Sequence, residues 1–381
     1  MSRNPVLALL ILCVSLMAYV TAYPFRFDFN RAAFLFLDFP QGRGIWLDAW
    51  LNLLFFVPFG LLCGLRFPGW RGVAACALAG FLFSSAIESL QMYIPGRLAS
   101  ANDIVMNSLG AILGAVTANR KRLRAASFEG WLRNEIPGDR VGILVGLWVV
   151  SQWSPFIPLL KINWILSQLK LDFRWEMNLA QLLPILFGGC AVVFLLAENL
   201  KPASAKRAGW ILIGLLPIQL ILWDRPRPFS AVLVCAVAMG LAIWWLDRTH
   251  PNQGQWLTIA ALAIIVIREL SPFRWAPELI AEFLWVPLRG TMDSPRIHAL
   301  PVLAEKCFFY WYFLHQANRS FGISLAKLAL ALSAFVALAE LGQRYQLGRI
   351  PEITDPLLCL LGALILYWSA KADQGLNRAL R

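Results

Sequence analysis

The chain has 381 residues, of which 59% are hydrophobic and 15% are charged, whereas about 25% of residues are charged in an ordinary soluble domain. Too few Asp, Glu, Lys and Arg residues are present to solvate the surface of a soluble enzyme, and the apolar content excludes a disordered chain. The net charge of +12 comes from short basic runs between apolar segments, so membrane topology explains it better than nucleic-acid binding.

Apolar segments recur along the whole chain. Because a bilayer span needs about 20 residues, the chain has room for about 12 spans, and we predict an all-α transmembrane helix bundle. Eleven is the alternative count, because Glu305, Lys306 and His315 interrupt one segment. The predicted spans are residues 6–22, 48–65, 73–93, 101–118, 141–154, 177–197, 209–223, 229–246, 256–270, 300–316, 323–342 and 354–370.

A four-helix unit is expected to occur three times. The first, fifth and ninth spans each end in a Pro-Phe pair and are followed by an amphipathic stretch that is too polar to span. We predict these stretches, residues 27–38, 160–173 and 277–289, to be helices that lie in the membrane interface. The predicted units are residues 1–125, 126–250 and 251–381.

The first and third units share polar residues in register at an offset of 252 positions. The pairs are Glu88 and Glu340, Gln91 and Gln343, Arg97 and Arg349, Asp103 and Asp355, and Gly110 and Gly362. The middle unit is degenerate, keeping Gln219 and Arg225 but neither acid. Since the first helix completes the first unit, we expect it to be retained, although Val20-Thr21-Ala22 resembles a signal-peptide cleavage site.

The basic run Arg120-Lys121-Arg122-Arg124 follows the fourth span. Lys and Arg in short loops favour the cytoplasmic side, so we predict that both termini are cytoplasmic. The connection between the third and fourth spans then lies at the outer face.

That connection carries the candidate site. Glu88 and Gln91 share one helix face, Pro95-Gly96 ends the helix, and Arg97 follows. Ser100 has the sequence of a helix N-cap, with Asp103 completing a capping box. Charged groups at membrane depth indicate a ligand or reaction site by default, but a carboxylate, Arg and carboxylate can also lock a hairpin. Both interpretations stay open.

Further residues extend the candidate site along the helices. Asp103, Asn107, Gly110 and Gly114 form one stripe, in which the glycines allow another helix to approach closely. On the second span, Asn52 is a candidate polar wall and Pro58 a kink. The corresponding secondary site in the third unit comprises Glu340, Gln343, Arg349 and Asp355.

The chemistry of the candidate site is compatible with more than one role. An Arg beside carboxylates suits capture of a phosphate, pyrophosphate or carboxylate, and two carboxylates suit acid and base work. No catalytic triad, phosphate-binding glycine loop or activated thiol is recognisable, so enzyme activity stays open. The seven Cys and three His residues are scattered, and we expect no disulfide, metal or other cofactor.

Residues 46–118 resemble the VanZ-like family of bacterial membrane proteins. The resemblance rests on Asn52-Leu53-Leu54-Phe55-Phe56-Val57-Pro58-Phe59-Gly60, on Glu88-Ser89-Leu90-Gln91, and on Arg97, Asp103, Asn107, Gly110 and Gly114. Residues 300–369 resemble it more weakly, with Cys359 in place of the Asn and Leu366 in place of the second Gly.

The resemblance implies a protein of the bacterial cytoplasmic membrane and cell envelope. The founding member is associated with resistance to the glycopeptide teicoplanin. We expect the membrane lipids as partners, no nucleic acid, and an anionic envelope ligand or lipid-linked precursor at the outer-facing site. The alternatives are a transporter or lipid flippase, and a non-catalytic membrane scaffold.

Overall fold

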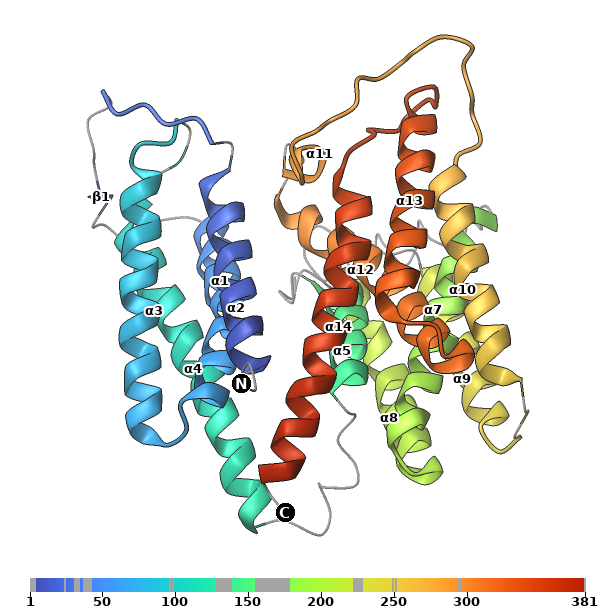
Figure 1. The fold of residues 1–381 in the computed structure, drawn as a ribbon, viewed down its shortest axis with the longest axis horizontal. Coiled ribbons are helices and arrows are strands. Elements are labelled where there is room, and N and C mark those ends of the chain that lie inside the picture. The colour runs from blue at the N-terminus through green and yellow to red at the C-terminus, as the bar shows by residue number, and fades with distance from the viewer. Residues whose placement is uncertain are drawn as a thin grey trace. The chain divides into compact units, whose positions relative to one another are not determined.

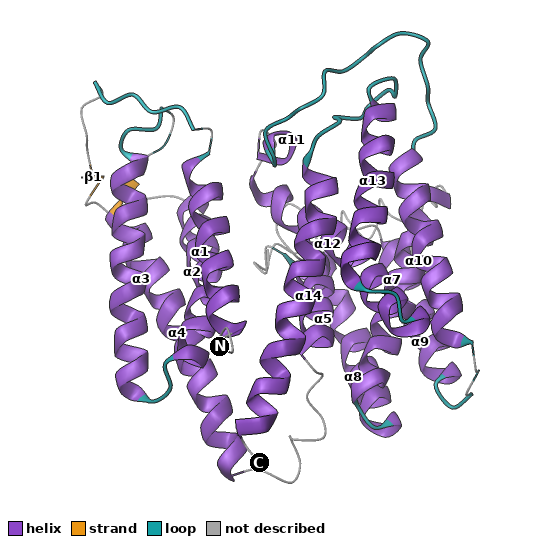
Figure 2. Cartoon of the chain, in the orientation of Figure 1, coloured by secondary structure: helices purple, strands orange, loops and turns teal. Residues whose placement is uncertain are grey.

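The computed structural model describes residues 5–23, 25–30, 35–36, 43–95, 97, 99–127, 139–154, 179–221, 229–248, 250, 252–292 and 296–379. Helices dominate these residues, as Figure 2 shows. The chain divides into two compact units, one of Met1–Arg133 with Lys371–Arg381 and one of Asn134–Ala370. We call them the N-terminal and the C-terminal unit.

The N-terminal unit is built on four helices (Figure 1). They are α1 (Pro5–Ala22), α2 (Arg43–Arg66), α3 (Trp70–Gln91) and α4 (Ala101–Ser127). Two short parallel strands, β1 (Leu35–Phe36) and β2 (Ala99–Ser100), pair beside the start of α4. At the other end of α3, Gly69 adopts a φ of 85°, and its N–H donates to Asn119 Oδ1 at 3.1 Å.

The C-terminal unit combines the predicted middle segment with the predicted third unit. Its first part contains α5 (Asp139–Trp153), α7 (Leu179–Asn199), α8 (Pro202–Leu215), the 3-10 helix η1 (Leu216–Ile221) and α9 (Phe229–Trp245). Its second part contains α10 (Gln253–Leu270), the short α11 (Arg289–Met292), α12 (Arg296–Phe321), α13 (Leu325–Gln343) and α14 (Thr354–Ala379), whose last residues group with the N-terminal unit.

Each of the twelve predicted apolar segments contains helix, which confirms the all-α class. Apolar sequence in a bilayer must satisfy its own backbone hydrogen bonds, and a helix does so within one segment. Among the described residues, five helices are long and apolar enough to cross a membrane: Asp48–Arg66, Trp70–Gln91, Ala180–Asn199, Gln253–Leu270 and Leu325–Gln343. Three shorter apolar helices accompany them: Leu9–Ala22, Arg140–Trp153 and Ser230–Trp245.

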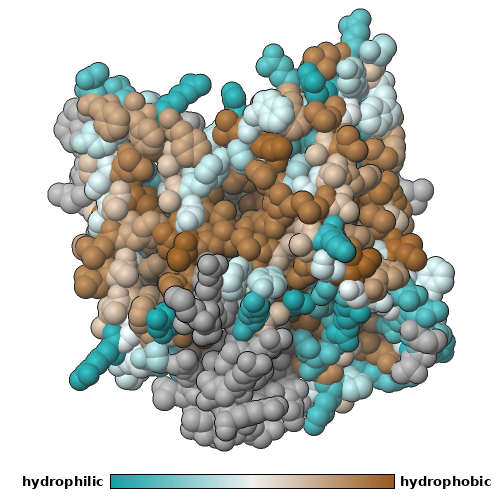
Figure 3. Space-filling model, viewed as in Figure 1, coloured by the Kyte–Doolittle hydropathy of each residue, from teal (hydrophilic) through white to brown (hydrophobic). Residues whose placement is uncertain are grey.

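The outer faces of the helices are apolar. On the face drawn in Figure 3, hydrophobic side chains gather over the middle of the helices and hydrophilic ones lie toward the helix ends. Many large apolar side chains are exposed, including Trp256 at 68% and Leu338 at 70%. An apolar belt of this kind fits a lipid environment.

The glycine stripe lets α4 lie directly against α2. A Cβ added at Gly110 would stand 2.1 Å from the Leu53 carbonyl oxygen, and one at Gly114 would stand 2.2 Å from that of Val57. From the other side, a Cβ added at Gly60 would stand 2.0 Å from the carbonyl oxygen of Ala111. Backbone touches backbone here, so no larger residue fits without moving a helix.

The predicted interfacial helices are wrong wherever they can be checked. Residues 277–288 are not helical, and residues 27–30 together with β1 replace helix in the first stretch; residues 160–173 lie outside the described chain. The backbone N–H groups of Ala276, Ile280 and Leu284 donate to Tyr345, Arg344 and Pro351. Pairing with the connection between α13 and α14 thus takes, at Leu284, a donor that the predicted helix would have used internally, and it fixes the segment at Ala276 and Ile280 as well.

The α2–α4 contact generates the first prediction. Gly114→Ala should lower the free energy of unfolding by about 1–3 kcal/mol, because the new Cβ meets backbone. The matched control is Gly240→Ala in α9, where nothing lies within 4 Å of the added Cβ. Thermal unfolding of both variants in detergent measures the effect; equal melting temperatures for the two would contradict the close approach.

Candidate functional site

The predicted site residues of the N-terminal unit gather where α1 ends, α3 ends and α4 begins. Glu88 is 3% exposed, and its Oε2 accepts a hydrogen bond from the backbone N–H of Ser100 at 2.9 Å. Arg97 and Asp103, both half-buried, are close enough for their charges to act on the Glu88 carboxyl group. The three charged side chains are therefore neighbours.

Gln91 and Arg97 both reach the end of α1. Gln91 Nε2 donates to the backbone carbonyl of Thr21 at 3.3 Å, and Arg97 Nη2 donates to that of Tyr23 at 3.4 Å. The last carbonyls of a helix have no partner within the helix, and a cation is favourable beside them. These two side chains therefore satisfy the end of α1 from the connection between α3 and α4.

Ser100 is the N-cap of α4, as predicted, since its Oγ accepts from the backbone N–H of Asn102 at 3.2 Å. The capping box itself is different from the prediction. Glu88 on α3, not Asp103 on α4, is the carboxylate that accepts the Ser100 N–H. In a capping box, the second hydrogen bond runs from the backbone N–H of the N-cap residue to a side-chain acceptor. Here that acceptor lies on another helix, so the bond joins the end of α3 to the start of α4.

The remaining candidates lie along α2 and α4. Asn107 is buried and donates from Nδ2 to Ser84 Oγ on α3 at 2.9 Å. Asn52 is half-buried on α2, and Pro58 is exposed inside the same helix. Asn107 therefore ties α4 to α3.

Residues of the C-terminal unit make the same hydrogen bonds at equivalent positions. Glu340 Oε2 accepts from the backbone N–H of Glu352 at 2.8 Å, Gln343 Nε2 donates to the carbonyl of Glu269 at 3.0 Å, and Arg349 Nε donates to that of Ser271 at 2.7 Å. Arg349 Nη2 also donates to the Arg268 carbonyl. Here too the Glu joins two helices and the Gln and Arg satisfy the end of a third.

The likeness extends to the backbone. The N–H of Asp28 donates to the carbonyl of Tyr93 at 2.8 Å, and that of Ala276 donates to Tyr345 at 2.8 Å. Phe25 and Phe273 both have a φ of 60°. The parallel pairing of Phe36 with Ser100 corresponds to the parallel bridge between Leu284 and Glu352. The two connections therefore have the same local architecture.

The C-terminal unit adds an ionised network that the sequence analysis missed. Lys306 Nζ lies 2.7 Å from Asp355 Oδ1 and 4.0 Å from Glu352 Oε1. Glu269, Glu340 and Asp355 each bring a carboxylate oxygen within 4.8 Å of the other two. The sequence signals for this network were Lys306 inside one apolar span and Glu269 at the end of another. Ionisable groups at such positions normally pair with one another.

One tyrosine bridges two acids of this network. The Tyr310 hydroxyl oxygen lies 2.7 Å from Glu269 Oε1 and 2.9 Å from Asp355 Oδ2. A hydroxyl carries a single proton and can donate only one hydrogen bond. The hydroxyl therefore lies between the Glu269 and Asp355 carboxyl groups and can donate to one of them at a time.

The three clustered carboxylates are a poor metal site in this arrangement. Their spacing is short enough for one cation, but Lys306 already supplies a positive charge to Asp355. Glu269 accepts hydrogen bonds from Tyr310 and, at 3.2 Å, from Gln343 Nε2. The oxygens that a metal would use are therefore engaged by side-chain donors.

Glu352 fastens the loop over this cluster. Its Oε2 accepts from the backbone N–H of Gly290 at 3.1 Å, and its Oε1 accepts from the hydroxyl of Thr291 at 3.3 Å. Burial raises the pKa of the Glu352 carboxyl group, and the nearby Lys306 opposes that rise. The residues around α11 are thereby held against the start of α14.

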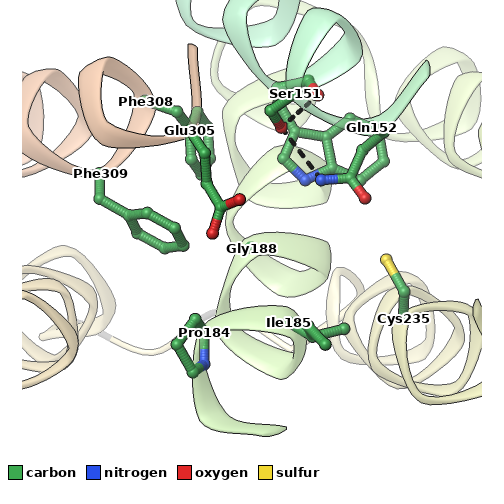
Figure 4. Close-up of a pocket in the computed structure, with 10 residues that line it drawn as sticks. Ser151, Gln152, Pro184, Ile185, Gly188, Cys235, Glu305, Phe308 and Phe309 are labelled. Atoms are coloured by element: carbon green, nitrogen blue, oxygen red, sulfur yellow. Dashed lines mark hydrogen bonds between the residues drawn. The ribbon is translucent and has the colours of Figure 1, made fainter. Parts of the chain in front are cut away.

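A small pocket lies elsewhere in the C-terminal unit, between α5, α7, α9 and α12. Figure 4 shows the Glu305 carboxylate directed into it, with Ser151 and Gln152 on one side and Phe309 on the other. Its volume of about 20 Å³ holds about one water molecule. Glu305 also pairs with Arg268 Nη1 at 2.6 Å.

The helices and the site together define a helical membrane protein with polar connections at helix ends. Comparison with protein families shows that residues 6–122, which lie in the N-terminal unit, are similar to the VanZ/LLP1 family. No curated protein and no solved structure matches the chain.

The cross-helix cap generates the second prediction. Glu88→Ala should lower the free energy of unfolding by about 1–3 kcal/mol, because it leaves the N–H of the half-buried Ser100 without its acceptor. Glu88→Gln keeps an oxygen acceptor and should cost clearly less. Ser89→Ala, at an exposed neighbouring position, is the control, and chemical denaturation in detergent ranks the three.

The ionised network generates the third prediction. Lys306→Met should lower the free energy of unfolding by about 3 kcal/mol or more, because Asp355 is 1% exposed and loses its cation. Lys306→Met combined with Asp355→Asn should recover part of the loss. Lys327→Met, at an exposed position on α13, should change little, and a double variant no better than the single one would refute the pairing.

Proposed function

We propose that this protein is a VanZ-type scaffold of the bacterial cell envelope, a multipass membrane protein whose Glu, Gln and Arg set is structural. The observation that carries the proposal is that these side chains form hydrogen bonds with backbone groups. Glu88, Gln91 and Arg97 bond to backbone groups of neighbouring segments, and Glu340, Gln343 and Arg349 do the same. Such bonds hold a connection in one shape and need no ligand.

We call each Glu, Gln and Arg set a lock: Glu88, Gln91 and Arg97 form the first, and Glu340, Gln343 and Arg349 form the second. We also propose that the VanZ-like unit is present twice with such a lock and once in degenerate form. The shared hydrogen bonds support the first and third copies. The Gln and Arg side chains of one unit lie 252 positions from those of the other, and the backbone carbonyls that they contact lie 248 positions apart. Thr21 and Glu269 differ by 248, as do Tyr23 and Ser271. The degenerate middle copy rests on Gln219 and Arg225 alone.

A second candidate function is binding of an anionic envelope ligand or lipid-linked precursor. The observation that favours it is the half-buried guanidinium of Arg97, near Glu88 and Asp103 at a helix end. The lock would then hold the arginine in a fixed orientation for a phosphate or carboxylate. Asn52 and Asn107 would line the same side, and resistance to teicoplanin is the phenotype to measure.

A fourth prediction separates the two functions. As a lock residue, Arg97→Gln should reduce the amount of folded protein several-fold and lower its melting temperature, because a charged donor to the Tyr23 carbonyl contributes about 1.5–3 kcal/mol. Size-exclusion chromatography and thermal unfolding of the purified full chain measure this. Arg71→Gln, exposed in the first turn of α3, is the matched control.

The opposite outcome favours ligand binding. Arg97→Gln protein that is as abundant and as stable as the wild type, but no longer protects cells against teicoplanin or binds a polyprenyl pyrophosphate precursor, would reject the scaffold proposal. Loss of folded protein without any measurable binding by the wild type would reject the ligand proposal.

A further inference from the structure

Buried polar side chains follow one face of α12 in the C-terminal unit. Tyr312, His315 and Gln316 lie at positions i, i+3 and i+4, so they share a face, and each is at least nine-tenths buried. Within the described residues, the Tyr312 hydroxyl, His315 Nδ1 and Gln316 Oε1 have no hydrogen-bond partner. Buried polar atoms are normally paired with protein or water, so three neighbouring exceptions point to a hydrated region.

This face opens to solvent at the end where α7 and α12 finish. His315 Nε2 lies 2.8 Å from Glu198 Oε2, which makes Nε2 the donor and leaves Nδ1 toward the protein. Arg319 Nη1 donates to the same Glu198 oxygen at 2.9 Å, and its side chain is 55% exposed. A proton on this pair can therefore exchange with bulk water.

In the other direction, the face leads to the pocket of Figure 4. Glu305 precedes Tyr312 by seven residues, which is about 10 Å along the helix axis. The rings of Phe308 and Phe187 bracket Tyr312, with centroid distances of 5.8 and 5.4 Å, and Phe308 also lines the pocket. The Phe308 ring therefore contacts both Tyr312 and the pocket.

Beyond the pocket, three more buried polar atoms have no partner in the described part of the chain. They are Ser154 Oγ just after α5, Ser230 Oγ at the start of α9, and Gln219 Nε2 on η1. η1 packs against both α5 and α9, and Ser154 follows the pocket residue Ser151 by about one turn. The unpaired groups therefore continue to the opposite end of the bundle.

We propose that the C-terminal unit carries protons across the membrane along this hydrated path, from the Glu198–His315 pair through Tyr312 and the Glu305 pocket to Ser154, Gln219 and Ser230. Chains of acids, histidines and water are the usual means of moving protons through a helix bundle. The path is lined by α5, α7, α9 and α12 and does not use the lock residues, so it is independent of the proposed scaffold function.

Proton number is conserved at each step. Tyr312 accepts a proton from water on the pocket side while its own hydroxyl proton passes through water to His315 Nδ1. The resulting imidazolium releases its Nε2 proton to Glu198, which gives it to bulk water near Arg319. Rotation of the hydroxyl and exchange of the histidine tautomer restore the starting state, and no oxidant or co-substrate is required.

The experiment uses the full chain in liposomes that contain a pH-sensitive dye, with a potassium gradient and valinomycin providing the membrane potential. Wild-type vesicles should take up protons at least about tenfold faster than protein-free vesicles. Tyr312→Phe removes only the hydroxyl and keeps the buried ring, so the protein should fold while proton uptake falls to about the protein-free rate. Melting temperature and chromatographic profile confirm folding.

Tyr367→Phe on α14 is the matched control, because this tyrosine is 44% exposed and lies off the path; it should conduct like the wild type. Proton uptake by Tyr312→Phe at the wild-type rate would overturn the proposal. So would wild-type uptake no faster than that of protein-free vesicles, or an equal leak of sodium, which indicates an unselective defect.

Discussion

The structure depends on pairing backbone groups at helix ends where water is scarce. A helix leaves its first N–H and last C=O groups without internal partners, and within a membrane each unpaired group is costly. Glu88 and Glu340 accept an N–H at or just before the start of a following helix, and Arg97 and Arg349 donate to carbonyls at the end of a preceding one. Three helix ends are thereby fixed by two charged residues.

The two locks share their bonds but differ in their surroundings. Where the N-terminal unit has Thr21, the C-terminal unit has Glu269. When Phe55-Phe56 is aligned with Phe308-Phe309, Lys306 and Tyr310 correspond to Leu53 and Val57. The second lock therefore lies inside a network of four acids, a lysine and a tyrosine. Tyr310 contacts two of those acids, Glu269 and Asp355, whereas the first lock has no counterpart of the tyrosine or of Glu269.

The middle segment contributes walls to the C-terminal unit. Its helices α5, α7 and α9 line the pocket together with α12, and Glu198 at the end of α7 binds His315 and Arg319. The middle segment, which we propose to be a degenerate copy without the two acids of the lock, thus carries polar residues elsewhere. Gln219, which the sequence comparison recognised only as a remnant of the motif, lies on η1 between α5 and α9.

The sequence by itself determined the all-α class and the helical segments, and it predicted the glycine contact of α4 and the correspondence of the two polar motifs, because apolar length, small-residue spacing and residue register are local properties. Only the tertiary structure decided that Glu88 caps Ser100 across two helices, that Lys306 joins Asp355, and that residues 277–288 pair with a neighbouring loop instead of forming a helix. Each of these depends on which distant backbone or side-chain group supplies the hydrogen-bond partner, and an amphipathic pattern or a lone charge does not specify that group.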